Sequence, residues 1–460
     1  MAAADMLIEP HHNVVVGLGR SGLAIAEHLS RRGEAFVMAD TRPRPPGFEE
    51  FQRLYPDAPV HCGDLRELDL QRAGRVILSP GVDTRTPGLE QSGLEVVGET
   101  ALFVEALSER SQRPMLIAIT GSNAKSTVTT LVGDMARACG IDVAVGGNLG
   151  TPALTLLKQQ PTAECFVLEL SSFQLETTPQ LGADIAVYLN LSGDHLDRHD
   201  GMAGYAHAKQ QIFNGAGVGI INRDDPATTP CETAQVARTL SFGSDRPGSD
   251  GDWGLVARDA GVWLMRGGQS VMAARDVMMP GQHNLLNVLA ALAVGHEAGW
   301  SLDDMLHTVT HFAGLPHRAQ RVADINGVTW INDSKGTNVG ATLAAIEGIG
   351  VTLTGRLILL AGGVGKGADF TPLAAPLARH ARAVVVYGRD RELLARALRA
   401  AVTVVIVDTL EQAMQHAMGV AQPRDAVLLS PACASLDQFD NFEARGEAFC
   451  AWLQQWQPHS

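Results

Sequence analysis

The sequence has few cysteines and no long apolar or basic run, and each shortage excludes a class of protein. Its 460 residues include six cysteines, none in Cys-x-x-Cys spacing, which favours free thiols in a reducing compartment over a disulfide scaffold. No stretch approaches the ~18 consecutive apolar residues that a membrane-spanning helix needs. Residues 1–12 lack the basic and apolar segments of a signal peptide. We therefore expect a cytoplasmic protein without a membrane span.

A basic surface is also missing. The net charge is −14 and the lysines and arginines are scattered, which argues against nucleic acid as a partner. The chain is 45% hydrophobic and 19% charged, with 48 glycines, a composition typical of soluble α/β proteins. Its length predicts two or three domains, each with its own core.

The most informative segment is MLIAITGSNAKSTVTT, from Met115 to Thr130. A strand-like run to Thr120 is followed by a tight turn and a helix that we expect to reach about Cys139. Strand, turn, Lys-Ser/Thr and helix form the layout of a loop that binds polyphosphate through backbone N–H groups, a lysine and a magnesium-binding hydroxyl. The candidate loop residues are Gly121, Ser122, Asn123, Ala124, Lys125, Ser126 and Thr127.

This match to the phosphate-loop pattern is incomplete. Ile119 and Ala124 stand where the pattern has its two glycines. Taken alone, the segment is therefore also compatible with an ordinary strand-to-helix turn.

The N-terminal segment predicts a Rossmann-like unit. A strand at Asn13–Val16 precedes a Gly-x-Gly-x-x-Gly turn, and a second strand, Ala35–Met38, leads to Asp40. A third strand at Arg75–Leu78 ends in the Ser79-Pro80-Gly81 turn. Roughly 100 residues precede the phosphate loop, which is short for a full dinucleotide fold and favours a mononucleotide site. The pattern alone leaves open dinucleotides, nucleotide sugars or no ligand.

Polar residues follow the predicted strands of the central segment. Asn148 and His195 follow strands at 142–145 and 185–190, and Glu169 lies at the end of a strand at 165–170. Carboxyl ends of parallel strands share one edge, so these groups should lie near the phosphate loop. Glu169 and His195 suit a divalent cation, although each alone is more often a structural residue.

Two predicted helices carry further candidates. Lys209 lies on a helix over Tyr205–Phe213, where a lone lysine is usually only solvated. Asn284 and Asn287 lie one turn apart on a long helix that ends near Ala298, so both side chains can contact the same ligand. Asn284 is alternatively a helix cap.

The C-terminal segment predicts a third, parallel α/β domain. Strands at 329–331, 356–360, 384–387, 402–407 and 426–429 end in polar turns. These turns contain Lys335 and Lys366, cations suited to an anionic substrate. The predicted division is 1–105, 106–314 and 315–460, with the first and last domains Rossmann-like and the central one a phosphate-loop ATPase-like domain with a mostly parallel sheet.

Taken together, these motifs resemble the Mur ligases, the ATP-dependent amide-bond formers of peptidoglycan precursor synthesis. The resemblance extends from Val14 to the final helix. Besides the phosphate loop, it is carried by VLELSSFQLE, GDHLDRH, GLPHR, INDSKGTN and LLSPACASLDQF. Within the family the chain is most similar to the members that add D-glutamate to UDP-N-acetylmuramoyl-L-alanine.

The resemblance implies roles for the central and third domains. Lys125 would hold the ATP phosphates, and two Mg²⁺ ions would be bound by Ser126, Glu169, His195 and a Lys209 carbamylated by CO₂. The implied catalytic residues are Lys125, Glu169, His195 and Lys209, and Asn284, Asn287, Arg318 and Asp333 would contact the rest of ATP. The implied D-glutamate contacts are Thr337, Lys366, Ser435, Leu436 and Phe439.

The UDP-substrate contacts that the resemblance implies lie mainly in the first domain. They are Arg20, Ser21, Asp40, Thr41, Arg42, Ser79, Gly81 and, from the central domain, Asn148. A monomer is expected, with small-molecule substrates as its partners.

The chain departs from the family pattern at two positions. Ala124 precedes Lys125 where the family has glycine, and Val364 stands where an aspartate is frequent. Because the catalytic residues are retained, we expect a negative φ at Ala124 and a small effect of Ala124→Gly. A positive φ would instead predict a gain in ATP use for the glycine variant.

Two other functions fit parts of the sequence. A catalytically weak homologue that senses UDP-sugar or ATP would explain Ala124, but it has no need of Lys125, Glu169, His195 and Lys209 together. A nicotinamide-dependent dehydrogenase would explain the N-terminal glycine turn, but neither the phosphate loop nor the third domain. Binding of UDP, ATP and NAD would separate the three.

Overall fold

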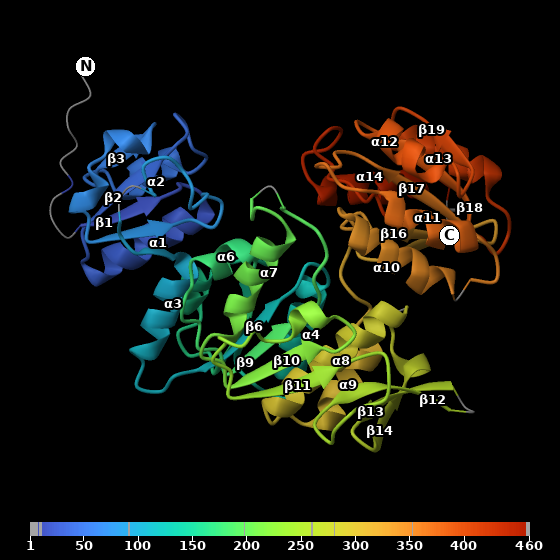
Figure 1. Ribbon diagram of the computed structural model, residues 1–460, viewed down its shortest axis with the longest axis horizontal. Helices are drawn as coiled ribbons and strands as arrows, with labels where there is room; N and C mark the ends of the chain where they lie inside the picture. The colour runs from blue at the N-terminus through green and yellow to red at the C-terminus, as the bar shows by residue number, and fades with distance from the viewer. Residues whose placement is uncertain are drawn as a thin grey trace.

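The computed structural model describes residues 8, 12–90, 93–196, 198–258, 261–279, 281–351 and 353–456. Three α/β domains follow one another along the chain, each built on its own sheet (Figure 1). In this view the first and third domains lie at opposite ends of the molecule, and both adjoin the central domain. The predicted three-domain α/β class is confirmed. No described helix is long and apolar enough to cross a membrane.

The first domain has a five-stranded parallel sheet in the order β3-β2-β1-β4-β5. The order reverses between β1 and β4, and ligands bind parallel sheets at such a point, outside the carboxyl ends of the strands. The strands are β1 (Asn13–Val16), β2 (Phe36–Asp40), β3 (Val60–Cys62), β4 (Arg75–Leu78) and β5 (Val96–Gly98). The helices are α1 (Arg20–Arg32), α2 (Phe48–Leu54) and α3 (Glu99–Ser108).

The central domain has a nine-stranded sheet in the order β14-β13-β12-β11-β10-β9-β6-β8-β7. Strand β6, which leads into the phosphate loop, is paired in parallel with β8 and β9. The strands are β6 (Met115–Thr120), β7 (Val143–Gly147), β8 (Cys165–Glu169), β9 (Ile185–Tyr188), β10 (Val218–Asn222), β11 (Arg238–Phe242), β12 (Trp253–Arg258), β13 (Gly261–Arg266) and β14 (Gln269–Ala273). The helices are α4 (Lys125–Ala138), α5 (Ala153–Gln159), α6 (Ser172–Glu176), α7 (Met202–Gln210), α8 (Gln282–Glu297) and α9 (Leu302–His311).

The third domain has a six-stranded sheet in the order β15-β16-β20-β17-β18-β19. Edge strand β15 is antiparallel to β16, so the prediction of a wholly parallel sheet was wrong at this edge. The strands are β15 (Gln320–Ile325), β16 (Val328–Asn332), β17 (Leu357–Gly362), β18 (Ala381–Tyr387), β19 (Val404–Ile406) and β20 (Ala426–Leu429). The helices are α10 (Val339–Gly350), α11 (Ala374–His380), α12 (Arg391–Leu398), α13 (Leu410–Val420) and α14 (Phe442–Gln454).

The hydrophobic cores join the first two domains and leave the third separate. One buried cluster includes Phe103 of α3 and Phe166 of β8, whose rings meet edge to face at 5.2 Å. The two large clusters of the third sheet contain third-domain residues alone among those that the structure describes. The predicted boundary at residue 105 lies within α3, a helix that packs against α1 of the first domain and α5 of the central domain. The exact division therefore stays a prediction.

Candidate active site

Two cavities open at the carboxyl ends of the parallel strands. The larger, about 670 Å³, is lined by the phosphate loop, by residues of α8 and α10 and by loops of the third domain, and we call it the phosphate-loop pocket. The other, about 650 Å³, is lined by the glycine turn of the first domain and by the segment after β7, and we call it the first-domain pocket. Asn148 lines both cavities, so the two adjoin.

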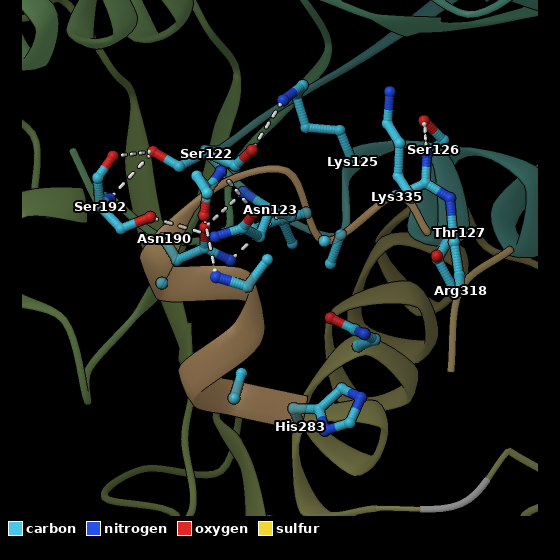
Figure 2. Close-up of a pocket in the computed structure, with 18 of the residues that line it drawn as sticks. Ser122, Asn123, Lys125, Ser126, Thr127, Asn190, Ser192, His283, Arg318 and Lys335 are labelled. Atoms are coloured by element: carbon cyan, nitrogen blue, oxygen red, sulfur yellow. Dashed lines mark hydrogen bonds between the residues drawn. The ribbon is translucent and has the colours of Figure 1, made fainter. Parts of the chain in front are cut away.

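The phosphate loop is held by the segment after β9. Asn123 N donates to Asn190 Oδ1 at 2.8 Å, and Ser122 N donates to Asn190 O at 2.9 Å. Ser122 Oγ donates to Ser192 O at 2.9 Å. Lys125 Nζ folds back onto the loop and donates to Ser122 O at 3.1 Å (Figure 2). It also donates to Gly121 O at 2.8 Å. These bonds fix the turn in front of the N-terminus of α4, where free backbone N–H groups favour an anion.

Ala124 is the N-cap residue of α4 and has φ 65° and ψ −4°. The expectation of a negative φ was therefore wrong. The loop retains the left-handed turn that a glycine would adopt without cost, and the methyl group of Ala124 lies against the apolar cluster under α4. Packing of the methyl group offsets part of the backbone strain.

Four buried or largely buried cations line the pocket: Lys125, Lys209, Arg318 and Lys335. Arg318 Nη2 donates to Ser126 Oγ at 2.7 Å, and Figure 2 shows Lys335 beside this pair. Burial lowers the pKa of Lys125 and, to about 8, that of Lys335. Lys335 Nζ also lies 4.0 Å from the centre of the Phe442 ring. An anionic ligand of high charge would satisfy these cations, whose desolvation is otherwise unfavourable.

Lys209 is buried, with 1% of its surface exposed. Its Nζ donates to Gly121 O at 2.8 Å and to Thr120 Oγ1 at 3.3 Å, and it lies 4.8 Å from the centre of the Tyr205 ring. Burial, and next the neighbouring Lys125 cation, hold the pKa of Lys209 well below its usual value. A neutral amine is a nucleophile, so Lys209 suits covalent modification better than the solvated lysine that its sequence context suggests.

Glu169 lies at the end of β8 and is buried. Its Oε1 accepts from Asn148 Nδ2 at 2.6 Å, and its Oε2 is buried with no hydrogen-bond partner among the described residues. His195, with 42% of its side chain exposed, lines the same pocket. An unpartnered carboxylate oxygen beside hydroxyl and imidazole groups fits a divalent cation. The described residues hold no group of three His, Cys, Asp or Glu side chains suited to a metal.

The predicted nucleotide contacts come together at the α8 side of this pocket. Asn287 Nδ2 donates to Asn284 Oδ1 at 3.0 Å, and both line the cavity. Asp333 accepts from Ser430 Oγ at 2.6 Å, and burial raises the pKa of Asp333 to about 6. Gly121 does not line the cavity, whereas the other predicted loop residues and Arg318 do.

The first-domain pocket contains every predicted UDP-substrate residue. It is lined by Arg20, Ser21, Asp40, Thr41, Arg42, Ser79, Gly81 and Asn148. Asp40 accepts from Leu18 N at 2.7 Å and pairs with Arg42 at 2.7 Å, so its carboxylate also shapes the glycine turn. Arg20 Nη2 donates to Gly150 O at 2.9 Å, across the boundary to the central domain.

The predicted D-glutamate residues are only partly brought to the phosphate-loop pocket. Thr337 and Lys366 line it, while Ser435, Leu436 and Phe439 do not. Ser435 is buried, Leu436 is 66% exposed, and Phe439 packs against the core of the third domain. The five residues therefore do not form one cavity in this arrangement of the domains.

Among the pocket residues that sequence reasoning missed are Phe173 and His283. Phe173 lies within the quoted VLELSSFQLE stretch, whose pattern marked the segment but not the ring. The ring of His283 lies close to Gly348 of α10, and burial lowers the pKa of His283 to about 4. Its position directly before Asn284 was the available signal.

Family models match all three domains. They are the MurD-like N-terminal domain of Mur ligases at residues 11–98, the Mur ligase middle domain at 119–295, and the Mur ligase glutamate ligase domain at 317–433.

Curated relatives match over almost the full length. UDP-N-acetylmuramoylalanine–D-glutamate ligase of Chromohalobacter salexigens is 58% identical over 448 residues, which cover 96% of this chain and 97% of the relative. The enzyme of the same name from Pseudomonas aeruginosa is 48% identical, over 98% of this chain and 99% of the relative.

Solved structures support the fold. The MurF ligase of Thermotoga maritima in complex with ADP has a TM-score of 0.61 at 17% identity, over 97% of this chain and 96% of that one. A pseudomurein peptide ligase type C of Methanothermus fervidus has a TM-score of 0.59 at 16% identity, over 97% of this chain and 100% of that one. By its full-length identity to curated relatives and its three matching domain models, the chain belongs to the Mur ligase family.

Proposed function

We propose that this protein is an ATP-dependent ligase that joins D-glutamate to UDP-N-acetylmuramoyl-L-alanine in peptidoglycan precursor synthesis in the cytoplasm. The names of its full-length relatives supply the substrates. The observation that carries the proposal is the meeting of the two cavities at Asn148. A UDP-sugar in the first-domain pocket can extend its carboxylate past Asn148 toward the phosphate loop.

The reaction needs an activated carboxylate, because a carboxylate is a poor electrophile. An oxygen of the alanyl carboxylate attacks the γ-phosphorus of ATP, the bond to ADP breaks, and an acyl phosphate forms. The D-glutamate amine then attacks the acyl carbon, inorganic phosphate leaves, and the nitrogen loses a proton. The buried Lys125 and Arg318 would balance the charge on the transferred phosphoryl group.

Mg²⁺ fits the donor groups of the phosphate-loop pocket. Ser126 and Glu169 would hold one ion, and His195 with a carbamylated Lys209 would hold a second. Glu169 Oε2 lacks a partner, which suits this role, while Ser126 Oγ would first have to part from Arg318. Bound Mg²⁺ would neutralise negative charge on the phosphates.

Carbamylation of Lys209 would turn a buried cation into a carboxylate. The neutral amine attacks CO₂, a C–N bond forms, and one proton leaves. Burial beside Lys125 supports this proposal, because it favours the neutral amine. The new anion would lie among the cations of the pocket.

The remaining contacts follow the family resemblance. Asn284, Asn287, Arg318 and Asp333 would bind the nucleoside and phosphates of ATP. The eight predicted residues that line the first-domain pocket would bind the UDP-sugar. Thr337 and Lys366 would contact D-glutamate, and Ser435, Leu436 and Phe439 would join them once the third domain moves. The active form would be a monomer.

One assay tests this function. Phosphate release from ATP is measured with UDP-N-acetylmuramoyl-L-alanine and either D- or L-glutamate. We expect release that requires the UDP-substrate and D-glutamate together, with L-glutamate much less effective. Binding of ATP and UDP without any phosphate release would contradict a ligase and favour a nucleotide sensor.

A further inference from the structure

Arg198 belongs to the GDHLDRH stretch, in which only His195 has a proposed role. Its guanidinium is largely buried, with 14% of the side chain exposed. Nη2 donates to Glu176 Oε2 at 2.8 Å and Nη1 donates to Glu176 Oε1 at 3.2 Å. This bidentate contact holds the Arg198 guanidinium at the C-terminal end of α6, because two parallel hydrogen bonds set both its distance and its orientation.

The same guanidinium contacts the first domain. Nη1 lies 3.4 Å from Asp83 Oδ1, and Asp83 lines the first-domain pocket. Thr84 Oγ1 donates to Glu176 Oε1 at 3.1 Å, which joins the same carboxylate to the same loop. The segment after β4 is thus tied to α6 through Arg198 and Glu176.

On its other side Arg198 contacts Phe173, a residue of the phosphate-loop pocket. Its Cζ lies 5.3 Å from the centre of the Phe173 ring, and that ring meets the His195 ring edge to face at 5.1 Å. Phe173 and His195 both line the phosphate-loop pocket, while Gln174, the next residue of α6, lines the first-domain pocket. Helix α6 is therefore a wall shared by the two cavities.

We propose that Arg198 is a positioning residue that couples occupancy of the first-domain pocket to the placement of His195 in the phosphate-loop pocket. A UDP-sugar that orders the Asp83 segment would fix Arg198, and Arg198 would fix Phe173 and with it His195. The inference rests on the proposed function, because it assigns the UDP-sugar and the metal-bound nucleotide to these two pockets. Any coupling works in both directions.

A nearby ion pair provides a matched control. Arg85 Nη1 lies 2.6 Å from Asp200 Oδ1 and also joins the first domain to the segment after His195. Asp200, however, is 78% exposed, so solvent screens the pair. Asp200→Asn should therefore leave the coupling as it is.

The test measures binding rather than turnover. The Kd of a non-hydrolysable ATP analogue with Mg²⁺ is determined by calorimetry with and without saturating UDP-N-acetylmuramoyl-L-alanine, for the wild type, Arg198→Lys, Asp83→Asn and Asp200→Asn. We expect the UDP-substrate to tighten nucleotide binding by roughly tenfold in the wild type and Asp200→Asn. In Arg198→Lys and Asp83→Asn the coupling factor should fall below about twofold. Lysine cannot form the bidentate pair with Glu176, and asparagine lacks the charge that Arg198 faces at position 83. Thermal melting checks that each variant is folded.

The outcomes separate the coupling from the function. Wild-type coupling in a folded Arg198→Lys, or a wild type that releases phosphate without any coupling, would overturn the role of Arg198 and leave the ligase proposal standing. A wild type that neither binds the UDP-substrate nor releases phosphate would overturn both. Equal weakening of both ligands with the coupling factor kept would mark Arg198 as merely structural.

Discussion

Ala124 places a side chain at a point of the phosphate loop where the backbone makes it energetically costly. Its φ of 65° lies in the left-handed region, which costs a non-glycine residue about 1–2 kcal/mol. Part of this cost is offset because alanine restricts the unfolded chain more than glycine does, by about 0.4–1 kcal/mol. The loop therefore folds with Ala124, although its functional backbone is less favoured than with glycine.

We predict that Ala124→Gly raises kcat/KM for ATP. Relief of the strain should increase the fraction of molecules with a correctly formed loop, by about threefold to tenfold, or roughly 0.7–1.4 kcal/mol. Steady-state kinetics at varied ATP checks this. Ala298→Gly is the control, because Ala298 has φ −75° and gains nothing from glycine. An unchanged or lower kcat/KM in Ala124→Gly would show that the strain has no effect on ATP use.

Substitution of Lys209 tests the proposed carbamate. We predict that Lys209→Ala loses activity by more than about 100-fold, the effect typical of removing one preorganised charged group. Added bicarbonate should not restore it, because the amine is gone, while acetate should restore part of it by replacing the carbamate. Phosphate release measures both.

The control for Lys209 is Lys158→Ala. Lys158 lies on α5, forms an ion pair with Glu27, and is 47% exposed, so its loss should cost little. Near-normal turnover in a Lys209→Ala protein would rule out the carbamate role. A mass increase of about 44 Da on Lys209 under CO₂ trapping would support it independently, as expected for addition of one CO₂.

At the scale of elements, buried parallel strands followed by polar turns were predictable. β6 and β20 were placed at their observed bounds, because apolar runs between glycine or polar residues define such strands well. β15, with the sequence QRVADI, alternates exposed and buried residues at a sheet edge and was missed. Its pairing with β16 depends on a short turn at Asn326 and Gly327, both with positive φ, which apolar periodicity does not indicate.

The candidate site was predictable where one motif carries several groups, as in the phosphate loop. Contacts between domains were not, because they depend on how separate elements dock. The family resemblance assigns Arg318 and Ser126 to one ATP site, but nothing in either local sequence predicts their direct contact across 192 positions. The contact of Arg198 with Asp83 crosses domains in the same way.

Helix α10 docks on the central domain through a glycine. An added Cβ at Gly340 would lie 2.6 Å from Ser192 Oγ, closer than packing allows. Asn338 Nδ2, at the N-cap of the same helix, donates to Asn123 Oδ1 of the phosphate loop at 3.2 Å. The first turn of α10 therefore needs a residue without a side chain in order to reach the loop.

We predict that Gly340→Ala keeps the fold but lowers kcat/KM for ATP by about tenfold, since α10 can no longer sit against Ser192. Alanine by itself favours a helix by about 0.5–1 kcal/mol, so a loss would report the docking and not the helix. Gly419→Ala on α13, where an added Cβ meets no atom within 4 Å, is the control and should raise the melting temperature. Equal kinetics for Gly340→Ala and the wild type would contradict the docking role.

At the scale of the whole molecule, the division of the hydrophobic cores indicates which domain can move. The first and central domains share a buried cluster that includes Phe103 and Phe166, and separating them would expose it to water. The third domain has its own clusters and meets the phosphate loop through polar contacts such as Arg318 with Ser126. Relative motion should therefore occur between the central and third domains.

We predict that an ATP analogue with Mg²⁺ and UDP-N-acetylmuramoyl-L-alanine together shift the third domain. Lys366 lines the phosphate-loop pocket while Ser435 lies outside it, so the proposed amino-acid site would meet this pocket in full only after the domain turns. Closure would also keep water from the acyl phosphate, which otherwise hydrolyses. Small-angle X-ray scattering should show a changed profile with both ligands, and a smaller change with the UDP-substrate alone.

Spin-label distances would locate this motion. A pair on α9 of the central domain and α12 of the third domain should change its separation when both ligands bind, because the two domains have separate cores. A pair on α1 of the first domain and α9 should keep its distance, since the first two domains share one core. A changed α1–α9 distance with an unchanged α9–α12 distance would place the hinge between the first and central domains and contradict this prediction. A scattering profile that neither ligand changes would argue against any domain movement.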